Sequence, residues 1–184
     1  MQDNEKSRLE QQVEQGLYGK PEIKKEEKNR FLGEFKERVI CFLTRQQIEE
    51  SGVYPQVLNA IQDSKAKKLI LDREIDENRA RDYIDLAREN KLDFKRVDSP
   101  DFKGEVGLVV VSDKAVDVKK RKIKNRKENL QNIGIDDKII ENVGAKLCKK
   151  CWRELEKKAP EELINYKKMS FIDRITGSTC VCKD

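Results

Sequence analysis

The stretch VGLVVV at residues 106–111 is the most apolar and the most β-prone run of the chain. Valine and leucine side chains pack well on the pleated, buried surface of a sheet, so this run predicts a strand. Turn-forming residues, Asp98-Ser99-Pro100-Asp101 and then Gly104, come before it and separate it from the preceding element. We expect this strand to be central in the sheet that organises the fold.

A strand, a helix and a second strand are predicted directly upstream of this run. Residues 68–72 (KLILD) and 94–97 (FKRV) have the composition of strands. Between them, Asp76 is suited to cap a helix that extends to Asn90. The apolar face of this helix consists of Ala80, Tyr83, Ile84 and Ala87. Two strands joined by a helix favour a parallel, right-handed crossover.

Two further helices are predicted nearer the N-terminus. Residues 31–50 carry apolar side chains at helical spacing, and Gly52 stands where a left-handed C-terminal cap would fall. Pro55 suits the first turn of a short helix that ends near Ser64. Together these elements predict a two-layer or three-layer α/β domain, in which helices cover a small sheet with partly parallel strands.

The composition indicates in which cellular compartment we expect the protein. The longest uninterrupted apolar stretch, residues 106–111, is far shorter than the ~20 residues that a membrane-spanning helix needs. The first six residues, MQDNEK, are polar and are not followed by an apolar run, which argues against a secretory signal. We therefore expect a cytoplasmic protein with no membrane contact and with reduced thiols.

Enzymatic chemistry receives little support. The 184 residues include no histidine, the side chain used most often as a general base near neutral pH. Four acidic residues follow the first predicted strand, and without a partner base we interpret them as a solvated loop: Asp72, Glu74, Asp76 and Glu77. The sequence indicates no catalytic residue, and we expect that the protein is not an enzyme.

The N-terminal half resembles a known family. The segments GLYGKPE at residues 16–22 and FLGEFKERV at 31–39, followed by Leu43-Thr44 and Gln47, are similar to the YueI-like family of uncharacterised bacterial proteins. The resemblance runs through the strand at 106–111 and covers residues 14–118. It implies a small α/β sandwich similar to the chorismate-mutase-like and kink-turn-binding ribosomal-protein folds, and it implies no established activity.

The remainder of the chain differs in charge. Residues 1–113 contain 21 basic and 24 acidic side chains, whereas residues 114–184 contain 19 and 11. We divide the chain into a polar segment (1–13), the YueI-like domain (14–118), a basic linker or helix (119–134) and a small helical, cysteine-bearing tail (135–184). Short helices are predicted in the tail at 136–143, 152–158, 160–166 and 170–175.

Four of the five cysteines form two close pairs in the tail, namely Cys148 with Cys151 and Cys180 with Cys182. Four thiolates make a closed tetrahedral zinc site, and a metal would tie together helices that are too short to be stable alone. The second pair has a one-residue gap, unlike an ordinary zinc ribbon, so free thiols, a disulfide or redox use and iron–sulfur ligation stay open. Cys41 lies near the apolar face of the helix predicted at residues 31–50 and is interpreted as a small core residue.

The basic run could neutralise several phosphates of a nucleic acid, and such binding would depend steeply on salt. No aromatic residue interleaves with the run, so a solvated connector is the alternative. The candidate contacts are Lys119, Lys120, Arg121, Lys122, Lys124, Arg126 and Lys127.

Two hypotheses of function follow. The first is a binding or regulatory protein with a zinc-stapled basic tail that contacts RNA or another protein. The second is a redox-responsive protein in which the tail thiols carry the chemistry.

Overall fold

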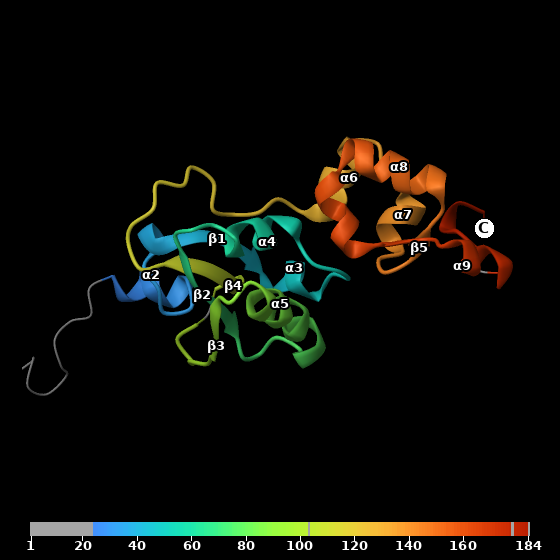
Figure 1. Cartoon of the computed structure of the whole chain (residues 1–184). Coiled ribbons are helices and arrows are strands. Elements are labelled where there is room, and N and C mark those ends of the chain that lie inside the picture. The colour runs from blue at the N-terminus through green and yellow to red at the C-terminus, as the bar shows by residue number, and fades with distance from the viewer. Residues whose placement is uncertain (1–23, 103, 178, 184) are drawn as a thin grey trace, which may run out of the picture.

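The structure is a computed structural model, and it describes residues 24–102, 104–177 and 179–183. The polar segment 1–13 and the glycine-containing motif at 16–22 lie outside the described residues. Figure 1 shows two lobes joined by an extended strap. We call residues 24–113 the core lobe, residues 114–125 the strap and residues 126–183 the C-terminal lobe.

The core lobe is built on one mixed sheet. Its strands are β1 (Val39–Thr44), β2 (Ala66–Asp72), β3 (Asp93–Val97) and β4 (Val106–Ser112), in the order β1-β4-β2-β3. The predicted central strand is confirmed, because β4 pairs antiparallel with both β1 and β2 and every one of its residues is buried. The predicted parallel pairing of β2 with β3, across helix α5 (Glu77–Glu89), is also confirmed.

Side chains alternate between two apolar clusters on the two faces of this sheet. Leu69, Leu71, Leu108 and Val110 pack with helices α3 (Arg45–Glu49), α4 (Pro55–Ile61) and α5. The intervening residues of β2 and β4 pack on the opposite face with residues of the segment that follows α2 (Lys25–Arg30), and this cluster includes Phe31, Leu32, Ile70, Val109 and Val111. Burial on both faces explains why β4 has no polar alternation.

The predicted helix at residues 31–50 is wrong. A short 3-10 helix, η1 (Lys36–Arg38), leads into β1, and α3 starts only at Arg45. Every residue of β1 is buried. The apolar spacing of this run also fits one face of a helix, but its β-branched and aromatic side chains pack well in a sheet, and the run forms a strand. Thr44 and Gln47 form a capping box at the start of α3, a local signal that the sequence carries.

The acidic cluster after β2 is not simply a solvated loop. Asp72 is only 2% exposed, and its carboxylate forms an ion pair with Arg45 at 2.5 Å. Arg45 also pairs with Glu74, at 2.6 Å. Arg45 lies beside β4 at Gly107, where a Cβ atom would come within 3.1 Å of the Arg45 Cα. The two carboxylates therefore help to seat α3 on the sheet.

The strap runs along the free edge of β1. The Phe42 amide donates to the carbonyl of Arg121 (3.0 Å), and the Ile123 amide donates to the carbonyl of Phe42 (3.4 Å). The guanidinium of Arg121 donates to three backbone carbonyls, at 2.9 Å each: those of Val39, Val116 and Val118. An edge strand is thus covered by a segment of the same chain.

The C-terminal lobe consists of short elements, as the sequence predicts. They are α6 (Arg126–Asn132), α7 (Asp137–Glu141), β5 (Lys146–Leu147), α8 (Lys149–Lys158), η2 (Pro160–Asn165), β6 (Lys167–Lys168), α9 (Phe171–Ile175) and η3 (Val181–Lys183). They enclose a second apolar cluster that includes Leu130, Ile139, Leu147, Leu155 and Tyr166.

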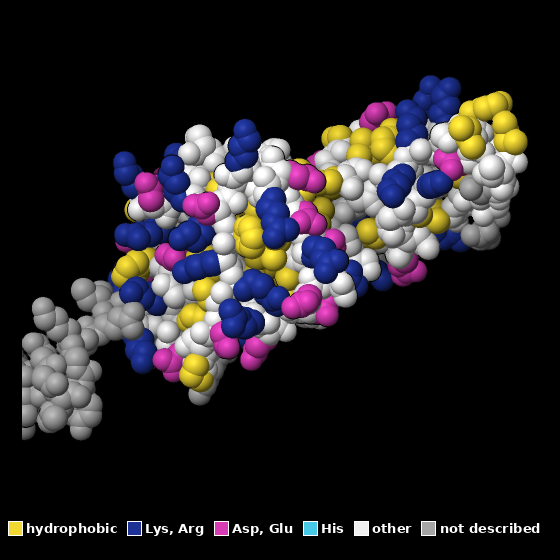
Figure 2. All heavy atoms as spheres, turned by 60° about the horizontal axis from the view of Figure 1, so that its bottom comes forward, with side chains coloured by type: hydrophobic (Ala, Val, Ile, Leu, Met, Phe, Trp, Pro, Cys, Tyr) yellow, Lys and Arg dark blue, Asp and Glu magenta, His cyan; other side chains and the backbone are white. Residues whose placement is uncertain are grey.

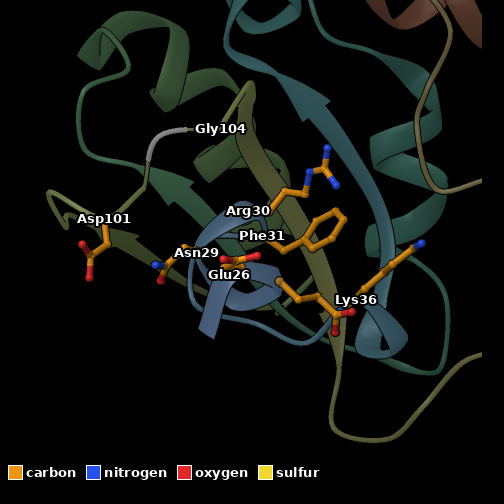
Figure 3. Close-up of a pocket in the computed structure, with 8 residues that line it drawn as sticks. Glu26, Asn29, Arg30, Phe31, Lys36, Asp101 and Gly104 are labelled. Carbon is orange, nitrogen blue, oxygen red and sulfur yellow. The ribbon is translucent and has the colours of Figure 1, made fainter. Parts of the chain in front are cut away.

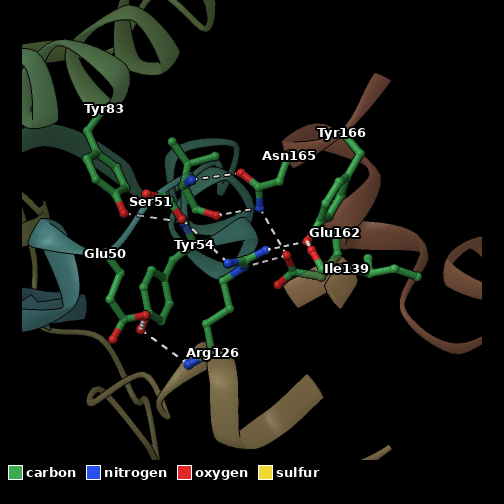
Figure 4. Close-up of polar contacts among 10 residues, drawn as sticks. Glu50, Ser51, Tyr54, Tyr83, Arg126, Ile139, Glu162, Asn165 and Tyr166 are labelled. Atoms are coloured by element: carbon green, nitrogen blue, oxygen red, sulfur yellow. Dashed lines mark hydrogen bonds and ion pairs between the residues drawn. The ribbon is translucent and has the colours of Figure 1, made fainter. Parts of the chain in front are cut away.

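A buried polar network joins the two lobes (Figure 4). Arg126 Nε pairs with Glu162 Oε2 at 2.7 Å, and the two side chains are 5% and 4% exposed. Burial disfavours the charge on Arg126, but Glu162 outweighs it and raises the pKa of the guanidinium. Tyr166 and Tyr54 extend the network, because Arg126 Nη2 donates to the Tyr166 hydroxyl and the Arg126 amide donates to the Tyr54 hydroxyl.

Asn165 completes the junction on the other side. Its side-chain amide donates to the carbonyl of Val53 (2.8 Å) and accepts from the Val53 amide (2.8 Å), as a neighbouring strand would. Gly52 approaches so closely that a Cβ atom would lie 2.7 Å from Asn165 Oδ1. The C-terminal lobe is therefore docked on α4 and its preceding loop rather than tethered.

We predict that Arg126→Ala lowers the free energy of unfolding by about 3–5 kcal/mol, because it leaves Glu162 buried without its partner. The neighbouring Lys127→Ala removes an exposed pair with Glu141 and should cost about 0–1 kcal/mol. Urea unfolding followed by circular dichroism measures both. If Arg126→Ala lowered the free energy of unfolding no more than Lys127→Ala does, the stabilising role assigned to the buried Arg126–Glu162 pair would be contradicted.

Candidate metal centre

The four tail cysteines converge in space. The sulfur atoms of Cys148, Cys151, Cys180 and Cys182 all lie within 4.8 Å of one another. Two sulfur pairs, Cys148 with Cys182 and Cys151 with Cys180, are 3.8 Å apart. A tetrahedral ion with metal–sulfur bonds of about 2.3 Å requires sulfur–sulfur distances of about 3.8 Å. The cluster thus has the dimensions of a four-thiolate metal site.

Two elements supply the ligands. Cys148 occupies the N-cap of α8, and Cys151 lies in its first turn. Cys180 and Cys182 flank the start of η3, and the backbone amide of Cys148 donates to Cys180 Sγ at 3.2 Å. Residues 32 positions apart are thereby brought together at the start of one helix, which explains why a one-residue gap in the second pair is no obstacle.

The four cysteines of the cluster differ in their exposure to water. Cys151 and Cys180 are buried in the lobe's apolar cluster, whereas Cys148 is partly exposed and Cys182 is exposed. A hydrogen bond from the backbone of Cys151, with a further one from Lys150, lowers the pKa of Cys148 to about 6. Burial raises the pKa of Cys151. Backbone donors near the sulfur of this N-cap residue favour its thiolate, the form that binds metals.

Lys149 and Lys150 stand beside the cluster at the start of α8, and both are exposed. Their charges lie next to a site that carries a net charge of −2 when four thiolates hold a divalent ion. Nearby, α9 presents three exposed apolar side chains at the outer end of the lobe, which Figure 2 shows as an apolar group there: Phe171, Ile172 and Ile175.

The seven residues of the predicted nucleic-acid set separate into two groups. Arg121 and Arg126 serve the fold, because the guanidinium of Arg121 bonds to backbone carbonyls of β1 and of the strap, and that of Arg126 bonds to Glu162. The guanidinium groups of these two arginines are therefore already engaged within the protein. The other five are exposed lysines on or next to the strap: Lys119, Lys120, Lys122, Lys124 and Lys127.

Three of these lysines are free of ion pairs within the described residues. Lys122 pairs with Glu105 (3.0 Å) and Lys127 with Glu141 (3.1 Å), both at exposed positions. Lys119, Lys120 and Lys124 have no such partner in that part of the chain. Sequence alone could not separate the structural arginines from the exposed lysines, because both kinds of residue belong to one continuous basic run.

A separate hollow of 660 Å³ lies beside α2 in the core lobe (Figure 3). Charges of both signs surround it, including Glu26, Arg30, Lys36 and Asp101. Its lining residues include no cysteine, serine or threonine, and the chain has no histidine, so a nucleophile paired with a general base is missing from these walls.

Fold and site together define an α/β domain of one mixed sheet that carries a small, cysteine-clustered helical lobe. The chain belongs to the family described as Protein of unknown function (DUF1694), whose profile matches residues 6–122. The resemblance to the YueI-like family is therefore confirmed. The match ends within the strap, so the cysteine cluster lies beyond it.

Two comparisons with relatives agree. The chain is 32% identical over 104 residues to "Uncharacterized protein YueI" of Bacillus subtilis (strain 168), which covers 56% of this chain and 79% of the relative. The crystal structure of the YueI protein from Bacillus subtilis superposes with a TM-score of 0.54 at 29% identity. That superposition covers 64% of this chain and 92% of the other.

Within the described residues, no helix combines the length and apolar character needed to cross a membrane.

We predict that Cys41 resists alkylation in the native protein. It is buried in β1, and burial raises the pKa of its thiol to about 12, so almost no thiolate exists at pH 8. Peptide mass mapping after a short iodoacetamide pulse on chelator-treated protein checks this, with the exposed Cys182 as the internal control. Equal labelling of Cys41 and Cys182 without denaturant would contradict it.

Proposed function

We propose that this chain is a non-enzymatic RNA-binding protein whose C-terminal lobe is folded around one structural zinc ion. The observation that carries the metal is the convergence of four sulfur atoms at tetrahedral spacing. Zinc fits best, because a closed set of four thiolates is characteristic of structural zinc sites. Such a site has no open position for a substrate, which is consistent with a structural role.

The lobe needs this support. Its longest helix, α8, has ten residues. The described residues from α9 onward contact the rest of the lobe through the ion pair of Asp173 with Lys146, the apolar packing of Cys180 and Val181, and the cysteine cluster. Helices of this length are marginal in water without packing or a cross-link. A metal held by α8 and by the last described turn closes the lobe from both ends.

Metal analysis tests this proposal. We expect one zinc per chain in protein purified without added metal, and loss of that zinc in Cys151→Ser and in Cys180→Ser. The matched control, Cys41→Ser, removes a thiol outside the cluster and should keep the ion. Because zinc binding of this kind contributes folding free energy, the two cluster variants should also show proteolysis confined to residues 126–183.

Iron in place of zinc would give a coloured protein that absorbs visible light. That result would change the identity of the ion but would keep the four cysteines as its ligands. Protein without metal and with four rapidly alkylated tail thiols would overturn the metal assignment. That result would favour the second candidate, a redox-responsive thiol protein, for which the lowered pKa of Cys148 is the one specific observation.

The nucleic-acid part of the proposal depends on the strap. Lys119, Lys120 and Lys124 are exposed and free of ion pairs within the described residues, and the strap that carries them is fixed to the edge of β1 by Arg121. Fixed cations on an extended segment can follow a phosphate backbone at little entropic cost. A single strand is favoured because an extended chain follows a flexible backbone, whereas the described residues offer no long basic helix that would enter a duplex groove.

We expect the affinity for a labelled single-stranded RNA to fall with salt at a log–log slope of about −3.5, as about five lysine contacts would produce. Replacing Lys119, Lys120 and Lys124 together with alanine should make the slope shallower by about 2. Fluorescence anisotropy between 50 and 300 mM KCl measures both. The control is Arg81→Ala on α5, an exposed cation away from the strap. Identical slopes for the triple variant and the wild type would contradict this role.

A further inference from the structure

A groove with a volume of 850 Å³ lies where the core lobe, the strap and the C-terminal lobe meet. The first turn of α3 forms one wall, α6 forms the other, and the strap from Lys122 to Asn125 forms the floor. The floor is rigid, because the buried Gln47 side chain donates to the carbonyl of Ile123 at 3.0 Å. This volume lies in the range of pockets that hold small organic groups.

Five residues with side-chain amides line this groove, and three of them are available to a ligand: Gln46 from α3 and Asn129 and Asn132 from α6. The two asparagines are three residues apart on one helix, so they share a face. None of these three amides bonds to any described residue, although the neighbouring Gln47 and Asn125 are both used within the fold. The groove thus concentrates unused groups that both donate and accept hydrogen bonds.

Two charged side chains of the groove suit different parts of a nucleic acid. Lys124 lies on the strap side and has no ion pair within the described part of the chain, and the carboxylate of Glu128 on α6 also lacks one there. A carboxylate repels phosphate but accepts hydrogen bonds from exocyclic amino groups, which adenine, cytosine and guanine carry and uracil lacks. Uracil offers carbonyl oxygens in place of those amino groups, so it is not favoured beside Glu128.

We propose that this groove reads the bases of the single strand whose phosphates lie on the strap. This inference rests on the proposed function, and it adds the chemistry that selects the ligand: bases with an exocyclic amino group, adenine and cytosine among them, enter the groove and meet Gln46, Asn129, Asn132 and Glu128, while Lys119, Lys120 and Lys124 hold the backbone. Amide side chains pair with adenine edges in this manner in nucleic-acid complexes. Lys124 lines the groove itself, and Lys119 and Lys120 precede it on the same strap, so one strand can reach both the groove and the cations.

The test compares three labelled 12-nucleotide RNAs, oligo(A), oligo(C) and oligo(U), on the full chain by fluorescence anisotropy. We expect oligo(A) and oligo(C) to bind at least about tenfold more tightly than oligo(U). The variant Gln46→Ala/Asn129→Ala/Asn132→Ala should reduce this preference to less than about threefold while keeping the salt slope. Glu128→Gln should weaken discrimination against oligo(U) without weakening the binding of oligo(U) itself.

Two controls keep the result specific. Asn78→Ala removes an exposed amide of α5 outside the groove and should leave the preference unchanged. Thermal unfolding of the triple amide variant should match that of the wild type, because these amides make no hydrogen bond with a described residue.

Failure of this inference and failure of the proposed function give different results. Equal binding of all three RNAs, or a preference that the amide variant retains, would overturn the base-reading groove and leave RNA binding on the strap intact. No binding of any of the three RNAs at 50 mM KCl would overturn both.

Discussion

The buried polar network around Arg126 and Asn165 is the constraint on which the two-lobed arrangement depends, because these two residues bond across the junction to Ser51, Val53 and Tyr54 of the core lobe. At its centre the charges of Arg126 and Glu162 are almost completely removed from water, so each requires the other, and Tyr166 and Asn165 contribute further hydrogen bonds. Because Arg126 begins α6 and Glu162 belongs to η2, the pair joins the start of the C-terminal lobe to its middle at the surface of the core lobe. The strap must then span a fixed distance between β4 and α6.

This fixed span gives the strap its properties. Arg121 binds it to β1, and Gln47 binds it at Ile123, so the exposed lysines between and beside these points stand on an ordered backbone. The same two anchors create the floor of the groove between α3 and α6. The cationic surface and the groove are therefore consequences of docking one lobe on the other, rather than features of either lobe alone.

The cysteine cluster addresses a different problem at the far end of the C-terminal lobe. A lobe of fewer than about 70 residues buries too little apolar surface to be stable without additional links. The polar junction with the core lobe supports α6, α7 and η2, whereas α8 and η3 meet at the cysteines. Metal and junction thus hold opposite ends of one small core.

The sequence by itself determined the central strand, the β2–α5–β3 crossover, the family and the four cysteines, because each depends on local composition, periodicity or a recognisable motif. It did not determine β1, since the run from Val39 to Leu43 fits the surface of a helix as well as a buried strand, and only the vacant edge of β4 selects between the two. Nor did it separate Arg121 and Arg126 from the lysines around them. Only the tertiary structure decided which of these cations are buried and which face water, because burial depends on Glu162 and on backbone carbonyls of β1 and the strap, and both Glu162 and Val39 are far from these arginines in the chain.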